Sequence, residues 1–183
     1  MIGPEPRIRR ELRPGDLGTI VAHHGRVYGP EYGVDPTFEA HVAASVARAA
    51  ARGFPSEREA ICLVELGGEH AGSIGLTDEG NDEAALRWVV LDARLRGQGL
   101  GRRLIGEMVA RARREGYLRL WLETFSELQA AAHLYREHGF ELLSEDTAPR
   151  WGRDEITYQR YDLDLERSGN PVSESAGAAL SRG

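Results

Sequence analysis

A glycine-rich turn between an apolar run and an amphipathic segment constrains this chain most. The run Ala84–Leu91 suits a buried strand, and the turn Arg96–Gly101 reads Arg-Gly-Gln-Gly-Leu-Gly. Apolar residues then recur at helical spacing, namely Leu100, Leu104, Ile105, Met108, Val109 and Ala112. Gly116 stands where a helix C-cap is expected. The pattern therefore predicts a strand, a turn and a helix in succession.

Such a turn is suited to holding an anion at the start of the helix. The first N–H groups of a helix have no partner within it and carry partial positive charge. Gly99 and Gly101 have no Cβ, so an anion can approach the backbone closely. Arginines flank the same point, and these are Arg96, Arg102 and Arg103. A diphosphate is the ligand that this arrangement favours, and a purely structural turn is the alternative.

Two familiar phosphate-binding patterns do not fit this turn. A P-loop ends in Gly-Lys-Ser/Thr, whereas Gly101 is followed here by two arginines. A dinucleotide fingerprint, G-x-G-x-x-G, needs glycine at position 102, which is Arg102. The expected diphosphate therefore belongs to another kind of carrier.

Composition limits the classes of function. A length of 183 residues is typical of one domain, and a net charge of −6 argues against nucleic-acid binding. The one cysteine, Cys62, lies in an apolar run, which excludes an internal disulfide and favours a reducing compartment. No membrane-length apolar stretch or signal peptide is visible. His23 and His24 lack further ligands at metal-binding spacing. We expect a cytoplasmic protein without membrane, nucleic-acid or metal partners.

Periodicity and turn residues predict the remaining elements. Before the glycine turn we expect a strand Arg7–Leu12, a helix capped by Asp16 and ended by a turn at Gly29–Gly33, a helix begun by Asp35-Pro36, and strands Ala60–Leu66 and Glu69–Thr77 joined by Gly67-Gly68. After it we expect a strand Leu118–Thr124, a helix Glu127–His138 capped by Ser126, a strand Phe140–Leu143, an irregular loop Asp146–Asp154 and a last strand Glu155–Leu165. This order makes one mixed sheet with helices on its faces.

Two motifs in these positions resemble the GNAT superfamily of acyl-CoA-dependent N-acetyltransferases. The turn Arg96–Gly101 matches the acetyl-CoA signature Gln/Arg-x-x-Gly-x-Gly/Ala, and Leu134–Phe140 matches a helix ending Leu-Tyr-x-x-x-Gly-Phe. The resemblance covers residues 7–165 and implies a single α/β (mixed α+β) domain. Its mixed, mostly antiparallel twisted sheet of about seven strands would be flanked by about four helices. Ala84–Leu91 and Leu118–Thr124 would be parallel and splayed apart. Residues 166–183 are expected to be a disordered tail.

A narrower resemblance is to the acetyltransferase half of bacterial proteins that fuse a MarR-type regulator to a GNAT domain. The segments that carry it are His24-Gly25-Arg26-Val27-Tyr28, Glu31-Tyr32-Gly33, Phe38-Glu39 and Ala71-Gly72-Ser73. The winged-helix half is absent, so we expect no DNA binding.

The resemblance implies acetyl-CoA as cosubstrate and assigns its site residue by residue. The strand would offer backbone groups to the pantetheine arm, and the turn would hold the pyrophosphate. The residues implied are Val89, Val90, Leu91, Arg96, Gly97, Gln98, Gly99, Leu100, Gly101, Arg102 and Arg103. Many relatives carry asparagine where this chain has Leu128, seven residues before Tyr135, so one polar contact is lost.

Acetyl transfer needs a neutral amine, a polarised thioester and a proton for the leaving thiolate. The resemblance implies Tyr135 as general acid, and a tyrosine with a pKa near ~10 can protonate a thiolate whose conjugate acid lies near ~8.5. A backbone N–H near Val89 or Val90 would polarise the thioester. The proton of the amine would pass to a base, for which the candidates are Glu31, Glu39, Glu83, Glu123 or a water chain. Of these we single out Glu123 and Glu31.

These observations predict an N-acetyltransferase, an acyltransferase that moves the acetyl group of acetyl-CoA to a primary amine by direct attack. The amine would belong to a small molecule, a peptide or a protein, and the enzyme would be a monomer or a homodimer. The alternative is a non-catalytic acyl-CoA-binding sensor or regulatory module.

Overall fold

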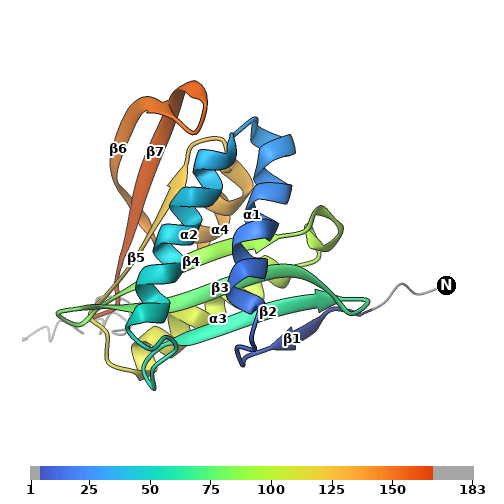
Figure 1. The fold of residues 1–183 in the computed structure, drawn as a ribbon. Helices are drawn as coiled ribbons and strands as arrows, with labels where there is room; N and C mark the ends of the chain where they lie inside the picture. Colours follow the sequence, from blue (N-terminus) through green and yellow to red (C-terminus); the bar gives the residue numbers. More distant parts are fainter. Residues whose placement is uncertain (1–4, 167–183) are drawn as a thin grey trace, which may run out of the picture.

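The computed structural model describes residues 5–166, which form a seven-stranded sheet between two layers of helices (Figure 1). The strand order is β1-β2-β3-β4-β5-β7-β6, with β1 Arg7–Arg9, β2 Ala60–Leu66, β3 Glu69–Gly80, β4 Glu83–Leu91, β5 Arg119–Phe125, β6 Glu141–Arg150 and β7 Arg153–Asp164. The helices are α1 Asp16–Tyr32, α2 Pro36–Ala51, α3 Leu100–Arg114 and α4 Gln129–Glu137, with a short 3-10 turn η1 at Ala93–Leu95. The predicted mixed fold is confirmed, while the predicted tail, beyond Glu166, lies outside the described residues.

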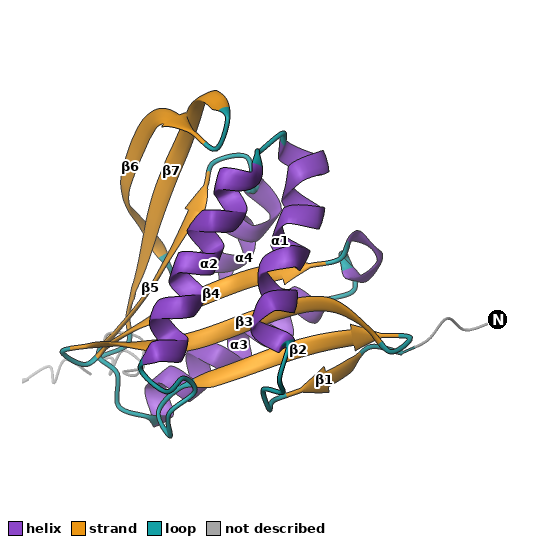
Figure 2. Ribbon diagram, viewed as in Figure 1, coloured by secondary structure: helices purple, strands orange, loops and turns teal. Residues whose placement is uncertain are grey.

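Alternation along the strands builds one apolar core on each face of the sheet. On β2, Cys62 and Val64 pack with α3 and α4, whereas Ile61 and Leu63 pack with α1 and α2. Figure 2 shows α1 and α2 in front of the sheet and α3 behind it. No helix within residues 5–166 is long and apolar enough to cross a membrane.

The parallel strands β4 and β5 separate halfway along their length, as the resemblance implied. They pair from Glu83 with Arg119 as far as Leu86 with Leu122. The register of β4 against β3 shifts between Ser73 and Gly75, and Trp88 in this irregular stretch has a positive φ of 53°. This bulge re-aims β4 away from β5. The two strands therefore open a gap in the middle of the sheet.

The first helix differs from its prediction at both ends. The predicted turn at Gly29–Gly33 is wrong, because α1 continues through Pro30 to Tyr32, and Gly33, with a φ of 68°, is its C-cap. Pro30 removes one hydrogen bond of the helix, and α1 nevertheless continues through it. Asp16 is not the N-cap, which is Gly15; its carboxylate instead pairs with Arg9 at 2.7 Å. The N-cap predicted for α2 is confirmed, since the Asp35 side chain accepts a bond from the backbone N–H of Thr37.

The end of the chain contains a hairpin where a loop was predicted. The prediction of an irregular loop over Asp146–Asp154 is wrong, because β6 continues to Arg150 and β7 begins at Arg153. In the turn between the two strands, Trp151 and Gly152 have φ of 52° and 77°. Two consecutive positive φ values are typical of a tight hairpin turn. Pro149 is tolerated because β6 is the edge strand.

The start of α4 also differs from its prediction. Ser126 is not its N-cap, because the helix begins after Leu128. The Ser126 N–H donates instead to Thr157 O at 2.9 Å, which continues the β5–β7 pairing by one residue.

Candidate active site

Two cavities meet where β4 and β5 diverge. The larger, of about 530 Å³, lies between the glycine turn, α4 and the end of α1, and we call it the glycine-turn cavity. The smaller, of about 100 Å³, lies between α1, α2, β4, β5 and β7, and we call it the aromatic pocket. Tyr28, Val89 and Leu128 line both. These three residues mark the junction at which groups from the two cavities can meet.

Most of the predicted cofactor residues line the glycine-turn cavity. They are Val89, Val90, Leu91, Arg96, Gly97, Gly99, Gly101 and Arg102. Gln98, Leu100 and Arg103 are outside this lining. The Gln98 side chain donates to Arg94 O at 2.7 Å, Leu100 is buried in the core, and Arg103 is exposed on α3.

The glycines of the turn have two different structural roles. Gly97 and Gly99 have φ of 73° and 76°, and a Cβ on either would meet open space, so they allow the turn and leave the backbone uncovered. A Cβ on Gly101 would lie 3.2 Å from Leu134 Cδ1 and 3.5 Å from Leu91 Cδ1. Gly101 therefore lets α3 approach both α4 and the end of β4. The N-terminus of α3 opens into a cavity that suits an anion.

Both arginines in the cavity lining are paired with glutamates. Arg96 forms a bidentate pair with Glu31 of α1 at 2.8 and 2.9 Å and also donates to Leu91 O at 3.0 Å. Hydrogen bonding to Glu31 raises the pKa of Arg96. Arg102 pairs with Glu137 of α4 at 2.8 Å. Glu31 thus lies beside the glycine turn and outside both linings. A phosphate in this cavity would replace one carboxylate partner of each arginine.

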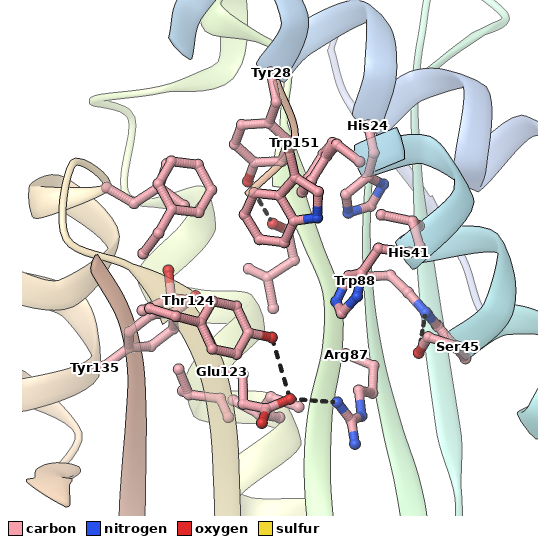
Figure 3. A pocket seen from close by; sticks show the side chains of 18 residues that line it. His24, Tyr28, His41, Ser45, Arg87, Trp88, Glu123, Thr124, Tyr135 and Trp151 are labelled. Carbon is pink, nitrogen blue, oxygen red and sulfur yellow. Dashed lines mark hydrogen bonds and ion pairs between the residues drawn. The ribbon is translucent and has the colours of Figure 1, made fainter. Parts of the chain in front are cut away.

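The aromatic pocket holds one carboxylate in its lining, that of Glu123 on β5 (Figure 3). Its Oε2 atom accepts from Tyr158 Oη at 3.3 Å and lies 3.3 Å from Arg87 Nη1. Arg87 also lies 3.5 Å from Glu79, and its guanidinium stacks 4.4 Å from the centre of the Trp121 ring. Glu123 is therefore held in place in the pocket lining by Tyr158 and Arg87.

Two tyrosines face the pocket from different helices. Tyr135 on α4 is 4% exposed and packs against the rings of Phe140 and Tyr161. Burial raises the pKa of the Tyr135 hydroxyl, so it stays protonated at neutral pH. Tyr28 on α1 donates its hydroxyl proton to Val89 O at 3.0 Å, and burial raises its pKa as well.

Sequence reasoning missed most of this pocket. It gave no role to His41, Arg87, Trp151 and Tyr158, and it named Tyr28 only as part of a motif. His41 follows Phe38 at helical spacing, which was a usable signal for one shared face. Trp151 was assigned to an irregular loop, so nothing local indicated that it would reach α2. Residues 5–166 contain no group of three or more His, Cys, Asp or Glu arranged to hold a metal ion.

Comparison with known proteins agrees with this fold. The model of the acetyltransferase (GNAT) family matches residues 22–140. Comparison with curated protein sequences gives no match. Similar solved structures include a GNAT-family acetyltransferase from Streptococcus pneumoniae, with 24% identity, 87% of this chain and 99% of that chain covered, and a TM-score of 0.65.

Two further structures share the fold. An N-acetyltransferase from Staphylococcus aureus Mu50 is 19% identical, with 88% of this chain and 99% of that chain covered and a TM-score of 0.66. The protein yncA from Salmonella typhimurium, solved with its cofactor acetyl-CoA, is 18% identical, with 92% and 99% covered and a TM-score of 0.63. Because the family match spans more than half of the 183 residues, the chain belongs to the GNAT acetyltransferase family.

Proposed function

We propose that this protein transfers the acetyl group of acetyl-CoA to the primary amine of a small molecule or peptide, by direct attack of the amine on the thioester. The observation that carries this proposal is the junction of the two cavities between the diverging strands β4 and β5. A glycine turn at a helix N-terminus lies on one side of it, and a buried tyrosine and a carboxylate lie on the other.

The glycine-turn cavity fits acetyl-CoA, which supplies the acetyl group as a thioester. Its volume of about 530 Å³ is within the roughly 300–1,000 Å³ of small-molecule sites. The backbone N–H groups of residues 97–101 would hold the pyrophosphate, with the two lining arginines, Arg96 and Arg102, as its cationic partners. Beyond Leu86, β4 has no pairing with β5 in the described part of the chain, so the backbone of Val89–Leu91 can pair with the pantetheine arm.

The aromatic pocket supplies the groups that move protons. Glu123 accepts one proton from the ammonium form of the acceptor. The neutral nitrogen then forms a bond to the acetyl carbon as the carbon–sulfur bond breaks, and the new amide nitrogen releases its second proton to solvent. Tyr135 donates its proton to the departing thiolate and regains one through solvent. A backbone N–H at Val89 or Val90 polarises the thioester oxygen.

The position of each candidate group supports these roles. Glu123 lines the pocket, whereas Glu31 is engaged by Arg96 beside the glycine turn, so Glu123 is the better base. The Tyr28 proton is donated to Val89 O, which leaves Tyr135 as the better acid.

The first test is thermal unfolding with and without acetyl-CoA. Ligand at ~100 times its dissociation constant should stabilise the fold by ~2.7 kcal/mol, a shift of roughly 5–10 °C. Gly99→Asp places a carboxylate at the proposed pyrophosphate site and should abolish the shift. A full shift in this variant would refute the placement of the site.

The second test is free-thiol release with a panel of amines. Tyr135→Phe should lower kcat by ~10²-fold or more and leave acetyl-CoA affinity unchanged, whereas the matched variant Tyr28→Phe should keep most of its turnover. The reverse ranking would remove Tyr135 from the acid role. If acetyl-CoA binds and no amine in the panel releases thiol, the alternative of a non-catalytic acyl-CoA-binding sensor is favoured. No contact among residues 5–166 supports that alternative by itself.

Two finer points belong to the same proposal. We infer a cytoplasmic site of action, because the one cysteine, Cys62, is a buried free thiol and burial raises its pKa to about 12, so the protein gains nothing from an oxidising compartment. The likeness to the catalytic half of MarR–GNAT fusions rests on motifs that include Tyr28 and Glu31, of which Tyr28 lines both cavities and Glu31 pairs with Arg96 beside the glycine turn.

A further inference from the structure

The β6–β7 hairpin closes one side of the aromatic pocket. Its tip residue Trp151 accepts a backbone hydrogen bond from Asp35 N at 2.8 Å, at the start of α2. A Cβ on Gly152 would lie 2.7 Å from Asp35 Oδ2, so only glycine lets the tip come this close. Arg153 pairs with Glu127 at 2.7 Å and donates to Tyr32 O at 3.3 Å. The tip is thus tied to both helices and to the loop after β5, and the pocket has a closed side.

Aromatic side chains form the walls of this pocket. Trp151 meets Phe38 edge to face at 4.9 Å between ring centres and His41 at 5.4 Å. The rings of Phe125 and Tyr158 lie 5.9 and 5.8 Å from the same indole. Such faces bind flat apolar groups and also attract an ammonium group.

The size of the pocket limits what can enter it. Its volume of about 100 Å³ is smaller than the roughly 150 Å³ apolar cavity that admits benzene. A short chain ending in an amine fits inside and reaches the junction at Val89. A flat group attached to that chain would lie at the mouth, where the exposed residue His41 and the partly exposed Trp151 are found.

The one arginine in the described lining of the aromatic pocket is already paired with carboxylates. Among the described lining residues, Arg87 is the one arginine or lysine, and both Glu79 and Glu123 already lie within 3.5 Å of it. Arg150, whose guanidinium lies over the Tyr158 ring, is paired with Asp146. A carboxylate beside Glu123 would be repelled, whereas an ammonium group would be attracted.

We infer that the acceptor is a small primary amine that carries a flat apolar group and no carboxylate, an arylalkylamine in chemical class, rather than a peptide segment. This inference rests on the proposed function. A peptide that presents its N-terminal amine carries a backbone branch on the carbon beside that amine, and a pocket of about 100 Å³ closed by the Trp151 hairpin has no room for this branch.

The experiment measures thiol release at saturating acetyl-CoA with three matched acceptors: 2-phenylethylamine, phenylalanine and a tripeptide that begins with phenylalanine. We expect kcat/KM for 2-phenylethylamine to exceed each of the others at least ~10-fold. Chemistry alone predicts the opposite order, because a peptide α-amine with a pKa near ~7.7–8.0 is far less protonated at neutral pH than an alkylamine near ~10.4.

Variants test the part played by the hairpin. Trp151→Ala should lower kcat/KM for 2-phenylethylamine by ~10-fold or more while butylamine, which lacks the ring, changes little. Trp151→Phe should recover most of the loss. Leu143→Ala is the control on the same hairpin, because this side chain is 62% exposed and is not part of the pocket lining. Thermal unfolding of each variant checks that it is folded.

The outcomes separate this inference from the proposed function. A tripeptide that is acetylated as efficiently as 2-phenylethylamine would overturn the closed-pocket inference and leave the acetyltransferase intact. Equal use of phenylalanine would overturn the charge argument. If acetyl-CoA binds and no amine releases thiol, the proposed function itself is refuted, and the inference is refuted with it.

Discussion

Acidification should destabilise this fold, and one buried histidine, His24, should account for a measurable part of the loss. His24 is 4% exposed, and its Nδ1 lies 2.8 Å from Ile20 O, so the neutral ring donates a proton there. Burial lowers the pKa of His24 from 6.5 to about 4. In this window the unfolded chain binds the proton more readily than the folded chain, so the free energy of unfolding falls as pH falls. Between pH ~6.5 and ~5, at ~1.4 kcal/mol per pH unit, the loss is about 2 kcal/mol.

The assay compares wild type with His24→Phe by urea unfolding at pH ~7.5 and ~5. Phenylalanine suits the site because the rings of Tyr28 and Phe38 lie 5.7 and 6.5 Å from that of His24. His70, whose pKa burial also lowers to about 4, is present in both proteins, so its effect cancels. The wild type should lose about 2 kcal/mol more than the variant on acidification. Equal losses in the two proteins would show that His24 does not carry the effect.

Further predictions concern the two cavities. Glu31→Gln releases Arg96 from its bidentate partner and should tighten acetyl-CoA binding by a factor of up to ~5, since an exposed pair of this kind is worth ~0.2–1 kcal/mol; calorimetry measures this, and weaker binding would contradict the proposed exchange of carboxylate for phosphate. Gly75→Ala would place a Cβ 2.8 Å from the Trp88 ring, so it should destabilise the fold by ~1–3 kcal/mol and lower kcat/KM by shifting this wall of the aromatic pocket. Unchanged unfolding and unchanged kinetics in this variant would show that the indole moves aside freely.

Local periodicity was enough to predict the interior of the fold. The alternation of Ile61 and Leu63 with Cys62 and Val64 marks a strand buried on both faces, and the helical spacing before Gly116 predicts α3. Gly67-Gly68 correctly indicates a hairpin. These features depend on residues close together in sequence.

Tertiary contacts decided the elements that sequence reasoning missed. Gly29 and Pro30 are local turn signals, yet packing of α1 on the sheet carries the helix past them to Tyr32. Pro149 and Gly152 likewise indicate a loop, but β7 supplies a partner along the whole of β6. The aromatic pocket was hidden for the same reason. Its walls come from segments as distant as Phe38 and Trp151, which no motif connects.

The short pairing between β4 and β5 joins two halves of the sheet that can move relative to each other. Four consecutive residue pairs connect the half made of β1–β4 to the half made of β5–β7, and these pairs run from Glu83–Arg119 to Leu86–Leu122. Beyond these pairs, two contacts connect the halves. The Tyr28 ring packs against Phe125, and the Asp35 N–H donates a hydrogen bond to Trp151 O. A cosubstrate bound along the unpaired edge of β4 would restrict the motion of both halves of the sheet. Amide hydrogen exchange should therefore slow in β5 as well as in β4 when acetyl-CoA binds, although β4 is the one of these two strands that would contact acetyl-CoA.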